Sequence, residues 1–200
     1  MTMRRRTHGF TLVELMIVVA IVGVLSALAI YGTSRYVAAA KSAEARNIVG
    51  AIARTAAMQY EIERSVGETL AESDTATPTS HLLCQSADAV PDTIDKVRGT
   101  KYQPAKMPGV DFGVGSNLIG WHCLTFTISQ AIYYQYDYNQ GPPYVSVGFG
   151  APDPGASGFE AVAMGDLDAD GVESVFARNG VVVNNTVKLT TQVFTADEFE

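Results

Sequence analysis

The stretch of residues 10–31 constrains this chain more than any other feature of its sequence. It contains 22 residues with a single charged side chain, Glu14, and three arginines at positions 4–6 precede it. As an α-helix the stretch would be roughly 33 Å long, which is enough to cross a hydrocarbon core of about 30 Å. The arginines favour a cytoplasmic N-terminus, so the rest of the chain is expected outside the cytoplasm.

Three interpretations of this segment compete. A secretory signal peptide has a shorter apolar core followed by a small-residue cleavage site, and residues 26–29, SALA, have that character. A plain signal anchor accounts for the length of the segment. It does not account for Glu14, because a carboxylate in lipid costs up to about 3 kcal/mol. In the third interpretation both the length and the carboxylate are functional.

The sequence GFTLVELMIVVAIVGVLSALAI, residues 9–30, closely resembles the N-terminal signature of type IV prepilins and type II secretion pseudopilins. The resemblance implies that a prepilin peptidase cleaves between Gly9 and Phe10 on the cytoplasmic side and methylates the new amine of Phe10. It also implies that Glu14 pairs with the N-terminal amine of a neighbouring subunit. Such a pairing relieves the cost of an unpaired carboxylate in lipid.

The helix is expected to continue beyond the membrane. Residues 32–64 are rich in alanine and contain no proline. Five residues recur at helical spacing and form one apolar face: Ala45, Val49, Ile52, Ala56 and Tyr60. Many members of the family have proline where this chain has Tyr31, whereas Gly32 is a weaker helix breaker. A continuous helix is therefore expected in the monomer.

After residue 118 the pattern changes to short alternating stretches typical of strands. Strands are expected at 122–129, 131–140, 144–150, 158–167 and 172–180, followed by a terminal hairpin with Asn184-Asn185 as its turn. The fold class is α+β and pilin-like. The long N-terminal helix, transmembrane in its first half, packs its second half on a four- to five-stranded antiparallel sheet.

The expected organisation has five parts: a cleaved leader at 1–9, a transmembrane polymerisation helix at 10–31, its amphipathic continuation at 32–64, a connecting loop region at 65–120 and the sheet of the globular head at 121–200. The connecting region is polar and rich in proline, with one or two short helical turns expected around 81–87. Three tyrosines at 134, 136 and 138 share one strand face. They indicate half-buried sheet, or alternatively an aromatic surface for adhesion.

Cys84 and Cys123 are the two cysteines of the chain. Outside the cytoplasm an even number of cysteines favours a disulfide, and this one links the connecting region to the start of the sheet. Closing a loop of that length is worth about 4 kcal/mol on the chain-entropy model. Pilins often carry their disulfide nearer the C-terminus, so the pairing departs from the family. The alternative is two unpaired buried thiols.

The sequence GDLDADGVES, residues 165–174, contains the first half of the calcium-loop motif D-x-D-x-D-G. Alternating carboxylates repel each other unless a cation neutralises them, and hard oxygen ligands suit Ca²⁺. The expected ligands are Asp166, Asp168, Asp170, the carbonyl of Val172 and Glu173, with Ser174 as an alternative to Glu173. Ala177 occupies the position of the bidentate glutamate, so the loop is not an EF-hand. A solvated turn between two strands also fits the sequence.

From Ser65 onward the chain has 17 Asp and Glu against 6 Lys and Arg. This acidic balance repels phosphate backbones, so direct binding of nucleic acid is not expected. The sequence also lacks G-x-S-x-G, H-E-x-x-H and Walker A motifs, so an enzyme is not expected.

The sequence favours a structural subunit that polymerises through its N-terminal helix into a type IV pilus. The alternatives are a pseudopilin or minor pilin of a type II secretion machine, and an adhesive or ligand-binding module on a pilin anchor. The resemblance implies other subunits, the prepilin peptidase and an inner-membrane assembly platform as partners. The expected location is the inner membrane, with the head in the periplasm, and then an extracellular pilus or a periplasmic pseudopilus.

Overall fold

The computed structural model describes residues 9–65 and 79–199. Apart from Gly9, the expected leader lies outside the described residues, and so do the arginines at 4–6. The chain divides into two compact units, residues 1–40 and 41–200.

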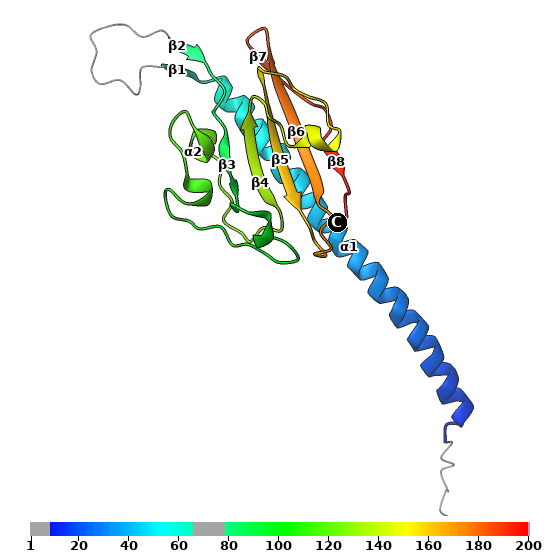
Figure 1. The fold of residues 1–200 in the computed structure, drawn as a ribbon. Coiled ribbons are helices and arrows are strands. Elements are labelled where there is room, and N and C mark those ends of the chain that lie inside the picture. Colours follow the sequence, from blue (N-terminus) through cyan, green and yellow to red (C-terminus); the bar gives the residue numbers. More distant parts are fainter. Residues whose placement is uncertain (1–8, 66–78, 200) are drawn as a thin grey trace, which may run out of the picture. The chain divides into compact units, whose positions relative to one another are not determined.

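The described part of the first unit is almost entirely the N-terminal portion of helix α1, which runs from Leu12 to Tyr60 (Figure 1). Alanine and leucine favour a helix here, and no proline interrupts it. The Ser26 hydroxyl donates to the Val22 carbonyl at 2.7 Å, so this polar side chain is satisfied within the helix. The helix passes through Tyr31 and Gly32 without a break, as expected.

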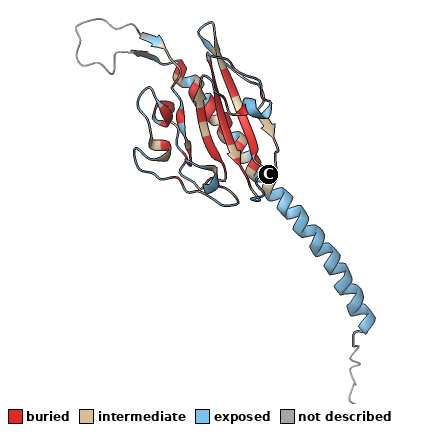
Figure 2. Ribbon diagram, in the orientation of Figure 1, coloured by how far each residue is buried: buried red, intermediate tan, exposed pale blue. Residues whose placement is uncertain are grey.

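The remainder of α1 belongs to the second unit and buries one face in its core (Figure 2). All five residues of the predicted apolar face are buried: Ala45, Val49, Ile52, Ala56 and Tyr60. The helix ends at Tyr60, four residues before the predicted end. The chain then enters strand β1 (Glu63–Ser65), which pairs with β2 (Thr79–His81).

Six strands form one antiparallel sheet in the second unit. Their order is β3 (Ala87–Val90), β4 (Gln135–Gln140), β5 (Gly158–Gly165), β6 (Ser174–Val183) and β7 (Thr186–Leu189), with β8 (Phe194–Ala196) also paired to β6. Strand β7 pairs with residues 180–183 of β6 and β8 with residues 175–177, so they share one edge. The sheet is thus five strands wide, because β7 and β8 pair with different parts of β6. The predicted α+β fold is confirmed.

The tyrosines of the β4 region belong to the core between the sheet and α1. Tyr134, Tyr136 and Tyr138 are buried in the same cluster as Val49 and Ile52 of the helix. Burial raises the pKa of Tyr134 to about 12 and that of Tyr136 well above its ordinary value. The interpretation of these residues as sheet core is confirmed, and they do not form an exposed aromatic surface.

The hairpin between β6 and β7 has the predicted turn. Asn184 and Asn185 have φ values of 52° and 57°. Asparagine tolerates this left-handed region better than most residues, and two such residues in a row make the tight turn that matches strand twist.

The predicted strand at 122–129 is wrong. Helix α2 (Gly120–Leu124) occupies the start of this range, and Thr125 ends it with a φ of 51°. The apolar residues here are buried by an aromatic cluster rather than by a sheet face. The Phe126 ring lies 6.0 Å from the rings of both Phe112 and Trp121. Alternation in so short a stretch did not distinguish these two environments.

The predicted strand at 144–150 is also wrong, because this segment contains the 3₁₀ helix η4 (Ser146–Phe149). Its first turn is held by the buried carboxylate of Glu160 on β5. The backbone N–H groups of Val145 and Ser146 donate to this carboxylate at 2.7 and 3.0 Å. A contact between two elements therefore decides the local structure.

The connecting region differs from its prediction in one further respect. No helical turn lies at 81–87 in this described stretch. Instead β2 ends at His81, and β3 begins at Ala87 and joins the edge of the main sheet beside β4. Among its described residues, the region also contains the 3₁₀ helices η2 (Ile94–Lys96) and η3 (Asp111–Gly113).

Candidate functional site

The start of α1 is closed by a reciprocal arrangement between Thr11 and Glu14. The Thr11 backbone N–H and hydroxyl donate to Glu14 Oε2 at 2.8 and 2.9 Å, and the Glu14 N–H donates to Thr11 Oγ1 at 3.3 Å. This is a capping box, in which the hydroxyl before the helix and the acid three positions later satisfy each other's free N–H groups. Phe10, immediately before the box, is 88% exposed.

The capping box corrects the expectation that Glu14 is unpaired within one chain. Both hydrogen bonds from Thr11 go to Oε2, and Oε1 has no donor among the described residues. The cost of the carboxylate in lipid is therefore reduced but not removed, because one oxygen still lacks a partner. Oε1 is the atom that a further cation can reach.

The first part of α1 exposes a long apolar surface. Among the described residues, α1 is the one helix long and apolar enough to cross a membrane, judged by length and composition. Its large apolar side chains between Leu12 and Ile30 are 54–75% exposed. Gly23 leaves space beside the helix, since nothing lies within 4 Å of a Cβ added there. Such a surface needs lipid or other helices around it.

Cys84 and Cys123 form the predicted disulfide, with a sulfur–sulfur distance of 2.04 Å. The bond joins α2 to the segment between β2 and β3. The same segment is fixed on the sheet, because the Tyr138 hydroxyl donates to the Cys84 carbonyl at 3.2 Å. Both cysteines are buried.

We expect the Cys84→Ala/Cys123→Ala double variant to lose about 4 kcal/mol of unfolding free energy, because the bridge closes a loop with a sequence separation of 39. Denaturant unfolding of the full chain in detergent micelles measures this difference. Reduced wild-type protein is the control and should fall close to the double variant. A loss below about 1 kcal/mol in both would contradict a stabilising role for the bridge.

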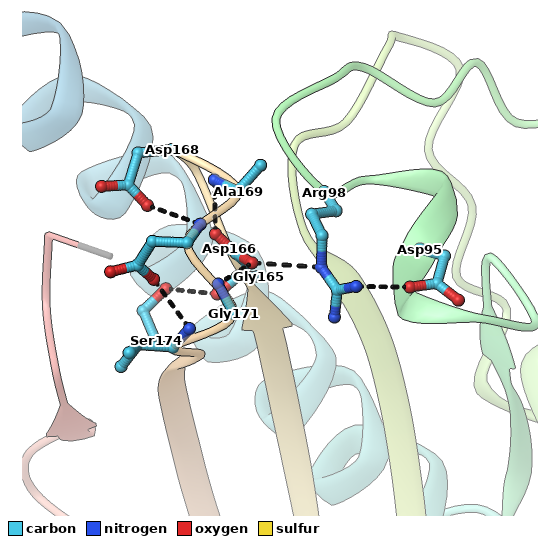
Figure 3. Close-up of polar contacts among 10 residues, drawn as sticks. Asp95, Arg98, Gly165, Asp166, Asp168, Ala169, Gly171 and Ser174 are labelled. Atoms are coloured by element: carbon cyan, nitrogen blue, oxygen red, sulfur yellow. Dashed lines mark hydrogen bonds and ion pairs between the residues drawn. The ribbon is translucent and has the colours of Figure 1, made fainter.

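The three aspartates of the loop after β5 lie close together. One carboxylate oxygen from each of Asp166, Asp168 and Asp170 is within 4.8 Å of the others, with Asp166 buried and the other two exposed. The N–H groups of Ala169 and Gly171 donate to Asp166 at 2.7 and 3.0 Å (Figure 3). Both donors have positive φ, 64° and 94°, so the loop curls around the Asp166 carboxylate.

Arg98 is a partner of this loop that the sequence does not indicate. Its Nε lies 3.1 Å from Asp166 Oδ2, and its Nη1 lies 2.8 Å from Asp95 Oδ1 (Figure 3). The Gly99 N–H also donates to the Asp166 carbonyl at 2.8 Å. The negative charge of buried Asp166 is thus balanced in part by a guanidinium. Asp168 and Asp170 are the carboxylates most open to a cation.

The other expected calcium ligands are the carbonyl of Val172, Glu173 and, as its alternative, Ser174. The Val172 N–H donates to Asp170 Oδ1 at 2.8 Å. Glu173 is not part of the carboxylate group formed by the described residues. The Ser174 hydroxyl donates to the Gly165 carbonyl at 3.0 Å and so closes the turn between β5 and β6. Ligation by Val172 and Glu173 stays a prediction.

Comparisons with known proteins agree with the N-terminal motif. Residues 4–30 match the family model described as the prokaryotic N-terminal methylation motif. This prepilin-type motif covers the start of α1, the long N-terminal helix on which the α+β fold is built.

Among individual proteins, the chain is 52% identical over 42 residues to the fimbrial protein EcpC of Eikenella corrodens. The aligned stretch covers 21% of this chain and 28% of that protein. No solved structure matches the chain.

Proposed function

We propose that this protein is a structural subunit that polymerises through α1 into a type IV pilus filament. The methylation motif on a helix with a long exposed apolar surface carries the proposal. In a membrane, lipid covers that surface; in a filament, the α1 helices of neighbouring copies cover it. The apolar surface of the helix is then kept out of water both in the membrane and in the filament, so a subunit can move from one to the other.

Cleavage between Gly9 and Phe10 creates the second element of the mechanism. The new N-terminal amine of Phe10 is a cation one residue before the capping box. Thr11 donates to Oε2 of Glu14, and Oε1, which has no donor among the described residues, can accept from the amine of a neighbouring copy. The pairing removes an uncompensated charge from an apolar environment and fixes the axial offset between subunits. The partners are other copies, the prepilin peptidase and the inner-membrane assembly platform.

The composition of sheared surface filaments tests the proposal. A major pilin is the dominant protein of such filaments. A trace amount, with filaments still formed when the gene is deleted, favours a minor pilin. Absence from surface filaments together with loss of protein secretion on deletion favours a pseudopilin of a type II secretion machine. Before assembly the protein is expected in the inner membrane, with its head in the periplasm.

We infer in addition that the loop at 165–174 binds Ca²⁺ weakly. The convergence of Asp166, Asp168 and Asp170 supports this, because two exposed carboxylates beside a buried one repel each other unless a cation lies among them. The neighbouring Arg98 lowers the affinity, since it already compensates Asp166. Extracellular calcium is plentiful, so a Kd of about 10⁻³ M suffices.

Calcium at 10 mM is expected to raise the melting temperature of the full chain by about 3–5 °C, because saturation at this Kd stabilises the folded state by about 1.4 kcal/mol. Asp168→Asn keeps an oxygen ligand but removes one of the negative charges that attract the cation, and it should reduce the rise. Asp153→Asn, an exposed aspartate outside the loop, is the matched control and should behave like wild type. Equal melting in calcium and in excess chelator would leave the solvated turn as the correct interpretation.

A further inference from the structure

A pocket of about 350 Å³ opens beside the C-terminal end of α1. Its apolar lining comes from Leu82, Leu83, Leu118, Ala156 and Val182. Its polar lining comes from Tyr60, His81, Gln85, Gln140 and Ser157. None of these residues is an aspartate, glutamate, lysine or arginine. The pocket therefore combines apolar surface with neutral polar groups, at the lower end of the size range of about 300–1,000 Å³ for small-molecule sites.

The walls of this pocket are held by backbone hydrogen bonds between distant segments. The Gln85 N–H donates to the Leu118 carbonyl at 2.9 Å, and the Val182 N–H donates to the Ser157 carbonyl at 3.1 Å. Cys84, next to Gln85, is fixed by the disulfide. A pocket with walls of this kind exists before a ligand arrives, so binding loses little conformational entropy.

Several polar side chains of the pocket have donors or acceptors with no hydrogen-bond partner among the described residues. His81 Nδ1 lies 3.1 Å from the Tyr60 carbonyl. A carbonyl only accepts, so Nδ1 is the donor in this contact, and Nε2 has no hydrogen-bond partner among the described residues. Among the described residues, the side chains of Gln85, Gln140 and Ser157 make no hydrogen bond. Each amide offers both donors and an acceptor.

We propose that this pocket binds a neutral sugar residue, such as the terminal residue of a surface glycan. A sugar ring has an apolar C–H face for the leucines and the valine. It also has hydroxyl groups that both donate and accept, and these match the two amides and His81 Nε2. The proposal does not depend on polymerisation. It gives the head a ligand whether or not the chain forms filaments.

The lining disfavours other classes of ligand. A phosphate or carboxylate would lose its hydration without gaining a cation, because no lysine or arginine lines the pocket among the described residues. A purely apolar molecule would cover the amides of Gln85 and Gln140 and leave their donors unpaired, which costs binding free energy. A neutral molecule with several hydroxyl groups incurs neither cost, because it carries no charge to dehydrate and can pair with the amides.

Saturation-transfer NMR on the full chain tests the proposal, in a detergent whose headgroup carries no sugar. The probes are galactose, glucose and N-acetylglucosamine, with glucose 6-phosphate as the charged counterpart of glucose. At least one neutral sugar should bind with a Kd on the order of 1 mM, and glucose 6-phosphate should bind more weakly than glucose.

Gln85→Leu and Gln140→Leu keep the side-chain volume and remove the hydrogen-bonding groups. Each should weaken binding by about 3- to 10-fold, since each removes one neutral hydrogen-bonding partner. Gln192→Leu, at an exposed residue outside the pocket, is the control and should leave the Kd unchanged. A melting temperature close to that of wild type verifies the fold of each variant. The proposal is overturned if no neutral sugar binds, if glucose 6-phosphate binds as well as glucose, or if both pocket variants bind like wild type.

Discussion

Replacing Glu14 with glutamine is expected to abolish filaments while leaving the subunit inserted in the membrane. Glutamine can take the place of glutamate in a capping box, so Thr11 still closes the start of α1. The negative charge is lost, and the amine of the neighbouring copy then has no carboxylate to pair with. Glu14→Ala should have the same effect on filaments and should insert at least as well as wild type, because a charge is removed from lipid.

Thr11→Ala is the matched control for this experiment. It removes the capping hydroxyl and keeps the carboxylate, at a cost of about 1 kcal/mol in helix stability. Filaments should persist at reduced abundance, as counted by electron microscopy after shearing. If Glu14→Gln forms filaments at normal abundance with normal processing, the charge of Glu14 is not needed and the proposed pairing is wrong.

Gly9→Glu is expected to block maturation and leave the uncleaved precursor in the membrane. A bulky charged side chain at the residue before the scissile bond should not fit a peptidase that recognises glycine there. Without cleavage the amine of Phe10 stays in a peptide bond and cannot act as a cation. Gel mobility of membrane fractions should show the longer chain, and surface filaments containing it should be absent.

Gly9→Ala provides the matched control, because its side chain is the smallest that differs from glycine. It should be cleaved, at a reduced rate. Mass spectrometry of the mature wild-type protein should give an N-terminus at Phe10 carrying one added methyl group. An N-terminus at Met1, or one after Ala29, would show that the segment is a plain anchor or a secretory signal peptide instead.

The features that the sequence predicted well are those that arise from regular local patterns. The apolar face from Ala45 to Tyr60 needs only a period of 3.6 residues, and burial of one helix face then follows. The turn at Asn184-Asn185 needs only two residues that tolerate positive φ between two apolar stretches. The disulfide needs only two cysteines and an oxidising compartment.

The features that it missed depend on contacts between distant residues. Glu160 holds the first turn of η4 through N–H groups of Val145 and Ser146, and nothing in residues 144–150 signals that contact. Arg98 compensates Asp166 from a segment expected to be loop. The capping box at Thr11 is different, because its T-x-x-E pattern is visible in the sequence.

The most direct test of the account is a cryo-electron microscopy reconstruction of the filament at side-chain resolution. We expect this chain in the filament, with the α1 helices of neighbouring copies packed together at its centre. Oε1 of Glu14 should lie about 3 Å from the methylated amine of Phe10 in an adjacent copy, the distance of a hydrogen bond between charged groups. A filament in which Glu14 faces no amine, or one built from a different chain, would contradict the account.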